Sequence, residues 1–158
     1  MRFVALAALS FVLMEPVTYA AHRWVMHGFG ERLHRSHHRP PTGGWEANDL
    51  YPVVFASVVL VGLYLGFNVP GLGGLVAVGV GVTAYGAAYA LVHDVYIHGR
   101  LPLFRGRRFA VLDRLADAHR IHHLYNGEPY GMLFPIVPAE LRERAARTDR
   151  DPLQRVAR

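Results

Sequence analysis

Three long apolar runs dominate the pattern of hydrophobic and polar positions, and the polar residues gather between and after them. The runs cover Phe3 to Ala21, Tyr51 to Val69 and Leu72 to Val92. Each is close to the roughly 20 residues that a tilted helix needs to cross a hydrocarbon core about 30 Å thick. The pattern therefore predicts an all-α integral membrane protein with about three transmembrane helices.

Glycines are frequent in the second and third runs. The second run holds a G-x3-G pair, and the third run holds five glycines; the positions are Gly62, Gly66, Gly73, Gly74, Gly79, Gly81 and Gly86. Small residues allow helix backbones to approach each other in lipid, where no hydrophobic force drives association. We therefore expect close helix packing along these two runs.

A cleavable signal peptide is the alternative interpretation of the first run, because Thr18-Tyr19-Ala20 resembles a small-x-small cleavage site. Against it, Arg2 is the single basic residue before the run, and Glu15-Pro16 interrupts the apolar sequence. Cleavage would also leave His22 two residues from the new terminus. We interpret the run as a membrane span.

An amphipathic pattern follows the third run. The residues at helical spacing on its apolar face are Val111, Leu112, Leu115, His119 and His122, and those opposite are Asp113, Arg114, Asp117 and Arg120. Residues Asn126 to Pro138 are rich in Gly, Pro and apolar side chains, which is typical of a loop at the membrane interface. The chain thus divides into a membrane-embedded domain, 1–138, and a charged cytoplasmic tail, 139–158, that begins as a helix and then becomes disordered.

Charge and parity predict the orientation. The net charge is +5, all seventeen basic residues are arginine, and twelve of them follow His98. Two spans separate the histidine-rich segment after the first run from the one after the third, so both segments return to the same side of the membrane. The uncharged turn from Asn68 to Gly71 lies on the other side. By the positive-inside rule the shared side is the cytoplasm, with the amino terminus outside.

All ten histidines fall into four short boxes, which alternate between H-x4-H and H-x2-H-H. They are His22 and His27; His34, His37 and His38; His93 and His98; and His119, His122 and His123. Residues at i, i+3 and i+4 lie within about 60° of one another around a helix, so each H-x2-H-H can present three rings to one cavity. An i, i+5 pair diverges by about 140° on an α-helix. We interpret such a pair as reaching towards different metals, or as lying where the helix tightens or ends.

Ten neutral nitrogen donors exceed the needs of one metal ion but suit two ions with about five nitrogens each. Imidazole alone does not identify the metal, since zinc, copper, iron and nickel all accept it. A structural zinc site takes four ligands and usually uses cysteine, of which the chain has none. A bis-histidine haem would leave eight histidines unexplained. The boxes therefore predict a di-metal site on cytoplasmic histidine-bearing helices.

The order of the four boxes around paired spans resembles the membrane fatty acid hydroxylase superfamily of non-haem di-iron oxygenases. Within it, "HRWVMHGFG", "LHRSHHRPPTGGWEANDLYPVVFA", "TAYGAAYALVHDVYIHGRLP" and "AHRIHHL" are similar to the bacterial β-carotene hydroxylases. The likeness covers roughly Glu15 to His123, and the stretch from Glu46 to Tyr51 separates this group from the members that act on fatty acids.

This resemblance implies an O2-dependent monooxygenase of the bacterial inner membrane that binds two iron ions through the ten histidines. It would hydroxylate C3 of the β-ionone ring and convert β-carotene to β-cryptoxanthin and zeaxanthin. Electrons would come from a ferredoxin-type donor, the substrate would come from the bilayer, and no nucleic acid is expected as a partner. Two alternatives stay open: another lipid oxygenase of the superfamily, such as a ketolase, desaturase or fatty acid hydroxylase, or a metal transporter. The transporter is disfavoured because the boxes sit at the ends of the spans.

Three acidic residues are candidates for supporting the metal ligands. Asp94 lies four residues before His98, where it could accept the second ring N–H of that histidine, although it could also face water. Glu15 is an ionisable group within a span, either functional or protonated and bonded to a neighbouring helix. Asp49 could act near the site or, with its neighbours Glu46 and Asn48, cap the second span.

Overall fold

The computed structural model describes residues 1–39, 45–104 and 106–153, and every regular element in these ranges is helical. The order is α1 (Arg2–Ala20), the π-helical η1 (Ala21–Phe29), α2 (Glu31–His34), η2 (Ala47–Asp49), α3 (Leu50–Asn68), α4 (Gly74–Ala90), the π-helical η3 (Leu91–Ile97), η4 (Pro102–Phe104), α5 (Ala110–Tyr125) and α6 (Ala139–Ala146). The all-α prediction is confirmed.

Three of the described helical segments are long and apolar enough to cross a membrane: Arg2–Phe29, Ala47–Asn68 and Gly74–Ile97. The helices α1, α3 and α4 begin within two residues of the starts of the three apolar runs, and the first and third segments extend past their runs because the H-x4-H pairs continue these helices. In the central parts of the spans most side chains point outwards, and α3 has no buried residue at all. That arrangement suits a lipid environment, where exposing an apolar side chain carries no free-energy penalty because lipid tails are equally apolar.

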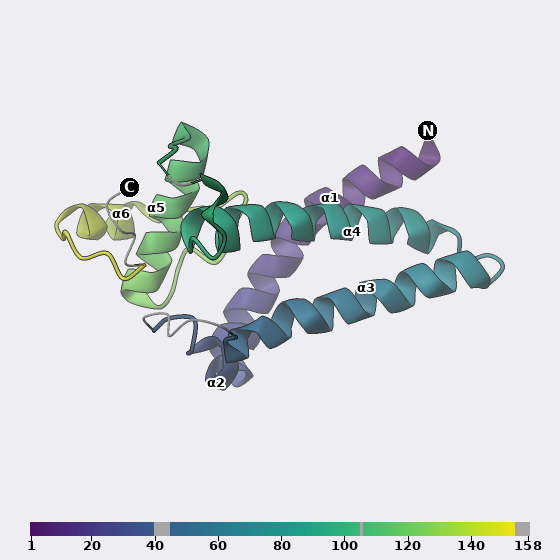
Figure 1. Cartoon of the computed structure of the whole chain (residues 1–158), viewed down its shortest axis with the longest axis horizontal. Coiled ribbons are helices and arrows are strands. Elements are labelled where there is room, and N and C mark those ends of the chain that lie inside the picture. Colours follow the sequence, from purple (N-terminus) through teal and green to yellow (C-terminus); the bar gives the residue numbers. More distant parts are fainter. Residues whose placement is uncertain (40–44, 105, 154–158) are drawn as a thin grey trace.

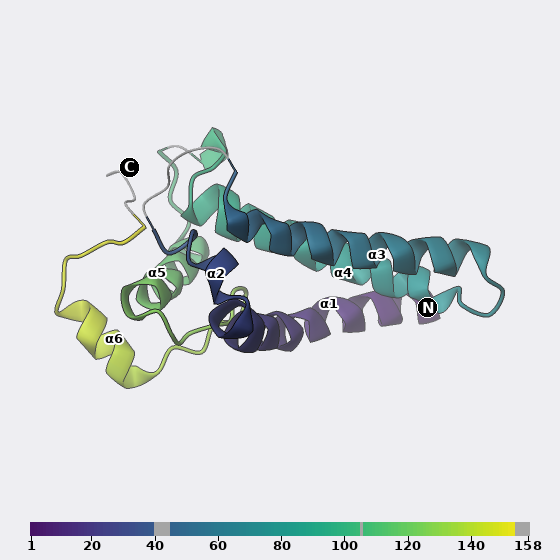
Figure 2. The ribbon, with the colours of Figure 1, turned by 90° about the horizontal axis from the view of Figure 1, so that it is seen from below.

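The helix α4 is the central span, since it packs against both α1 and α3. The amino terminus and the α3–α4 turn lie at one end of the bundle, whereas α5 and α6 lie at the other (Figures 1 and 2). Both histidine-rich segments therefore meet at the end opposite the amino terminus, as the even number of crossings between them requires.

Glycine allows α4 to approach its neighbours at particular positions. A Cβ atom on Gly81 would collide with the backbone carbonyl oxygen of Ala7 in α1. On Gly66 it would lie 2.9 Å from Val76 of α4. The positions Gly62 and Gly86 have no neighbour within 4 Å of such an atom. The close-packing prediction thus holds for some of these glycines and not for others.

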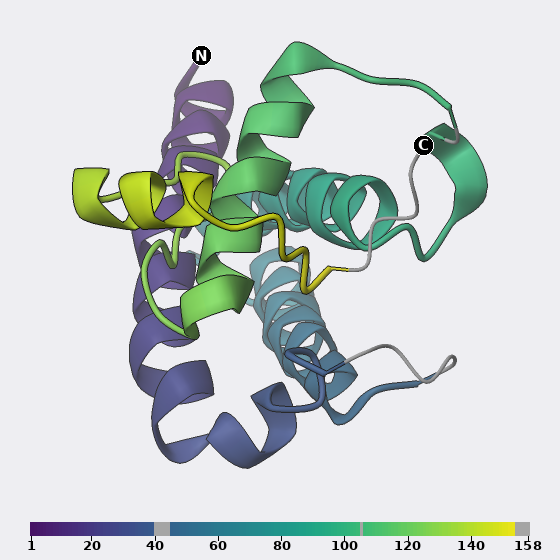
Figure 3. The ribbon, with the colours of Figure 1, turned by 90° about the vertical axis from the view of Figure 1, so that its left-hand side faces the viewer.

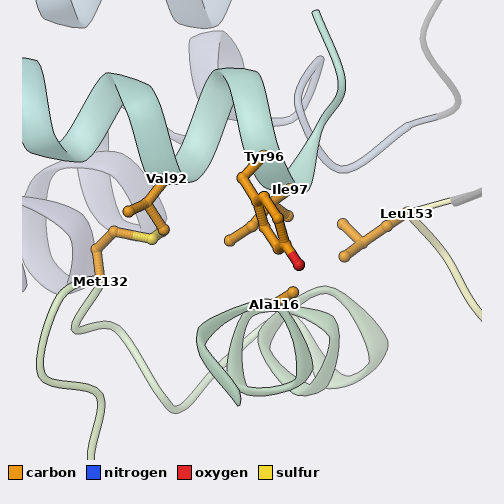
Figure 4. Packing of buried hydrophobic residues seen from close by; sticks show 6 residues of the cluster. All are labelled: Val92, Tyr96, Ile97, Ala116, Met132 and Leu153. Carbon is orange, nitrogen blue, oxygen red and sulfur yellow. The ribbon is translucent and has the colours of Figure 1, made fainter. Parts of the chain in front are cut away.

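The helix α5 lies across the end of the spans (Figure 3). A small apolar core joins it to η3 and to the chain that follows; its buried members are Val92, Tyr96, Ile97, Ala116, Met132 and Leu153 (Figure 4). Leu112 and Leu115 pack against this cluster, as predicted for the apolar face. Val111 does not, since its side chain is exposed.

The carboxy-terminal segment folds back on this core. Leu153 is buried there, and the Arg120 guanidinium donates hydrogen bonds to the carbonyl oxygens of Thr148 (2.8 Å) and Arg150 (2.6 Å). The tail is helical at first, as α6 shows. The expected disorder is wrong for residues 147–153, since Arg120 and the core give this segment partners, while residues 154–158 lie outside the described part of the chain.

Candidate metal centre

The histidines converge into two groups. In each group, one ring nitrogen per residue lies within 4.8 Å of the others. The first group is His22, His27, His34 and His122, and the second group is His37, His93, His98 and His119. Each therefore draws on three of the four boxes, which explains why no single box holds a metal by itself.

The two remaining histidines adjoin these groups. His38 Nε2 lies 3.1 Å from Nε2 of both His34 and His122 of the first group. His123 Nε2 lies 2.9 Å from Nε2 of His119 in the second. The His38 and His123 rings stack on each other with centroids 4.2 Å apart. All ten histidines thus form one cluster with five rings on each side.

The H-x4-H pairs lie on π-helical segments, η1 and η3. In a π-helix the backbone hydrogen bonds run from i+5 to i, as in the bond from the His98 N–H to the His93 carbonyl at 2.9 Å. Residues five apart therefore lie on one face. His22 and His27 belong to the same group, as do His93 and His98. The expectation that the two histidines of a pair reach different metals is wrong, and the helix widens instead of tightening. The alternative that the pairs lie where a helix ends is confirmed, since His98 is the C-cap residue of η3 and the helical backbone is interrupted at Gly28, directly after His27.

Five histidines have an outward partner for Nδ1, on the side of the ring away from the cluster. His22 Nδ1 lies 3.0 Å from the Tyr130 carbonyl oxygen, and His34 Nδ1 lies 2.7 Å from Asn48 Oδ1. The remaining three contacts join His122 to the Gly127 carbonyl, His93 to Asp94 and His37 to Glu46. For the first four of these histidines the acceptor places the ring proton on Nδ1 and leaves Nε2 free to bind a metal. The 3.6 Å between His37 and Glu46 is an electrostatic contact and not a hydrogen bond.

The inward Nε2 atoms then face each other without a proton between them. His22 and His34 both donate from Nδ1, yet their Nε2 atoms are 3.2 Å apart. In the second group the Nε2 atoms of His93 and His37 are 3.0 Å apart, and His93 donates from Nδ1 to Asp94. Facing lone pairs repel each other unless a cation lies between them, so the donor set fits a pair of metal ions.

Burial keeps these rings neutral. It lowers the pKa of His34 to about 4, although the hydrogen bond to Asn48 acts in the opposite direction. Burial and the neighbouring His34 lower the pKa of His38 to about 3. Burial and the neighbouring His123 hold the pKa of His119 well below its ordinary value. Neutral imidazole is the form that binds metals, so the site stays competent at physiological pH.

Arg100 connects the acidic residues behind the second group. Its guanidinium lies 2.7 Å from Asp49, 3.2 Å from Glu46 and 3.8 Å from Asp94. Asp94 Oδ1 faces His93 Nδ1 at 3.0 Å, and not His98 as predicted. The π-helix turns both histidines inwards, and Asp94 lies directly behind the ring of the residue before it. Asp49 contacts Arg100 and caps η2 through the Glu46 N–H, with no described contact to a histidine.

A segment after α5, which we call the strap (residues 126–134), joins the first group to the membrane-embedded helices. Its carbonyls at Gly127 and Tyr130 accept from His122 and His22. Near its start, Glu128 accepts hydrogen bonds from Tyr19 at 2.7 Å and from Arg23 at 3.0 Å. The predicted interfacial loop is therefore also a structural part of the site.

Glu15 in α1 fixes the other end of the strap. Its carboxylate oxygens accept the backbone N–H groups of Met132, Leu133 and Phe134 at 2.9, 3.2 and 3.0 Å, as well as the Tyr85 hydroxyl of α4 at 2.6 Å. Four donors use the full capacity of a carboxylate. The alternative that Glu15 bonds to a neighbouring helix is thus what the structure shows, with the strap as an additional partner.

Sequence reasoning missed several of these supporting residues. Asn48 and Glu46 were interpreted as parts of a cap, although Asn48 faces His34 and Glu46 faces His37. No role was predicted for Arg100. Asn48 carries a recognisable signal, since a buried amide next to a histidine box needs a partner. No sequence signal identifies the strap carbonyls, because every residue has a backbone carbonyl group.

The chain is similar to known proteins over most of its length. Residues 7–139 match the sequence profile of the fatty acid hydroxylase family. The chain belongs to this family. It is 42% identical to a beta-carotene hydroxylase of Pantoea ananas over 83% of the chain and 78% of that protein. It is 41% identical to a beta-carotene hydroxylase of Pseudescherichia vulneris over 88% of the chain and 82% of that protein. No solved structure matches the chain.

Proposed function

We propose that this member of the fatty acid hydroxylase family hydroxylates C3 of the β-ionone ring of carotenoids, converting β-carotene to β-cryptoxanthin and then zeaxanthin. The observation that carries the proposal is the pair of histidine groups, in each of which ring nitrogens of four residues lie within 4.8 Å of one another. Relatives called beta-carotene hydroxylase, at 41–42% identity over most of the chain, support the substrate class.

The ten histidines would hold two iron ions, five on each side of the cluster. When bound, the metal pair supplies the means to activate O2, so that one oxygen atom enters a C–H bond and the other leaves as water with two electrons from a ferredoxin-type donor. The protein's own residues hold the rings. Asp94 and Asn48 accept the Nδ1 hydrogen bonds of His93 and His34, while Asp49 positions Arg100 and Glu15 positions the strap.

Two other functions make different predictions. Another lipid oxygenase, such as a ketolase, desaturase or fatty acid hydroxylase, would use the same metal site on a different carbon or substrate. A metal transporter would place ligands along the spans, whereas these ten histidines form one cluster. The geometry therefore favours an oxygenase.

Expression in a bacterium that accumulates β-carotene is the test of substrate and reaction. We expect pigment chromatography to show β-cryptoxanthin and zeaxanthin, since the ring must approach the metal ions at the end of the bundle. The His122→Ala variant serves as the inactive control. Ketocarotenoids would point to a ketolase, and unchanged β-carotene with a well-expressed, iron-loaded protein would contradict the carotenoid proposal.

We also propose that the protein lies in the bacterial inner membrane with its histidine boxes on the cytoplasmic side. Two reporter fusions test this orientation. A reporter placed after Arg158 is expected to be active in the cytoplasm, because the arginine-rich segments favour that side. A reporter inserted between Val69 and Gly71 is expected to be active outside it. The opposite pattern would reverse the orientation.

A further inference from the structure

The two histidine groups differ in what lies behind their rings. In the first group, the outward Nδ1 atoms of His22, His34 and His122 face neutral acceptors: the Tyr130 carbonyl, the Asn48 amide oxygen and the Gly127 carbonyl. In the second group, Asp94 accepts from His93 at 3.0 Å. A second carboxylate, Glu46, lies 3.6 Å from His37 Nδ1, which is an electrostatic contact and not a hydrogen bond.

The surrounding charges increase this difference. Near the first group lie two one-to-one ion pairs, Arg23 with Glu128 at 3.0 Å and Arg35 with Glu31 at 3.1 Å. Behind the second group, three carboxylates share the single guanidinium of Arg100. The first set is formally neutral, and the second carries an excess of two negative charges.

A carboxylate behind a metal-binding imidazole strengthens the metal bond. It accepts a hydrogen bond from the Nδ1–H group, which raises the basicity of Nε2, and it adds negative charge near the cation. A neutral carbonyl fixes the ring in the same orientation but adds no charge. The two groups are therefore similar in donor number and different in electrostatics.

We propose that the two metal positions are inequivalent: the second group binds its ion more tightly than the first, and Asp94 is the positioning residue chiefly responsible. This rests on the proposed two-metal function. The reciprocal position is Asn48, whose Oδ1 lies 2.7 Å from His34 Nδ1 and whose replacement by aspartate would give the first group the same support.

The test is a titration of the metal-free, full-length protein in mild detergent with Co²⁺, followed by absorption spectroscopy. We expect two binding steps of different affinity. Asp94→Asn should weaken the tighter step by about 10- to 100-fold, the usual effect of removing such a partner. Asn48→Asp should strengthen the weaker step. Glu140→Gln, an exposed change on α6, should alter neither step.

Two further variants assign the steps. His119→Ala should remove the tighter step, and His122→Ala should remove the weaker one. Should either alanine variant fail to fold, Asp94→Asn and Asn48→Asp in the otherwise unaltered chain still decide the matter. Two equal steps, or an unchanged tighter step in Asp94→Asn, would overturn this inference and leave the two-metal site intact. Absence of Co²⁺ binding by the unaltered protein would overturn the two-metal site as well.

Discussion

Replacing His122 by alanine is expected to reduce the bound iron from about two ions per chain to about one and to abolish carotenoid hydroxylation. The His122 side chain is fully buried, and its Nε2 lies 3.2 Å from His27 Nε2 and 3.1 Å from His38 Nε2. Removing the ring deletes one donor from the first group together with its contacts to His27 and His38. Iron analysis of the purified protein and pigment chromatography measure the two effects.

His119→Ala is the matched variant for the second group, and it should also leave about one ion. Tyr64→Phe, on the exposed face of α3, controls for insertion and expression and should retain both ions and full activity. If His122→Ala kept two ions and normal hydroxylation, His122 would not be a ligand and the composition of the first group would have to change.

Glu15→Gln is expected to cause the second large effect, again at the first group, although Glu15 touches none of its rings in the described contacts. The amide replaces an oxygen with a donor, so at least one of the four donors that now face the carboxylate meets another donor. An unsatisfied buried group costs about 1–3 kcal/mol, and more where the lost acceptor was charged. The strap would loosen, and His22 and His122 would lose their outward hydrogen bonds.

The metal count separates two roles for Glu15. A positioning role predicts loss of about one ion together with loss of hydroxylation. A catalytic role, in which the carboxylate contacts the substrate, predicts that both ions remain while hydroxylation is lost. Glu140→Gln is the control, since it makes the same chemical change on an exposed helix. Retention of both ions and full activity in Glu15→Gln would contradict both roles.

The sequence predicted the spans and the histidine clusters well, for physical reasons. An apolar run of about 20 residues has few alternatives to a membrane helix. Ten imidazoles in a short apolar chain need partners that only a metal or many hydrogen bonds can supply. The parity of two crossings then placed both histidine-rich segments at one end. None of these steps requires knowledge of side-chain directions.

The supporting contacts could not be predicted in the same way. Assigning Asp94 to His98 assumed an α-helix, in which residues four apart share a face, but η3 is π-helical and Asp94 faces His93. The role of Glu15 depends on a strap more than 100 residues away in the chain, and its partners there are backbone N–H groups of no particular sequence. Leu153 was assigned to a disordered tail because its neighbours are charged, and the core that buries it forms only in three dimensions.

The two π-helical segments have a consequence for how such sites are found and how they arise. A π-helical turn is equivalent to an α-helix into which one extra residue has been inserted, with the surplus absorbed locally as a bulge. Each H-x4-H pair therefore corresponds to an ordinary H-x3-H pair with one insertion between its histidines. A search pattern written for α-helical spacing would overlook both pairs in this chain, whereas one that tolerates a single inserted residue would align η1 and η3 with α-helical metal sites.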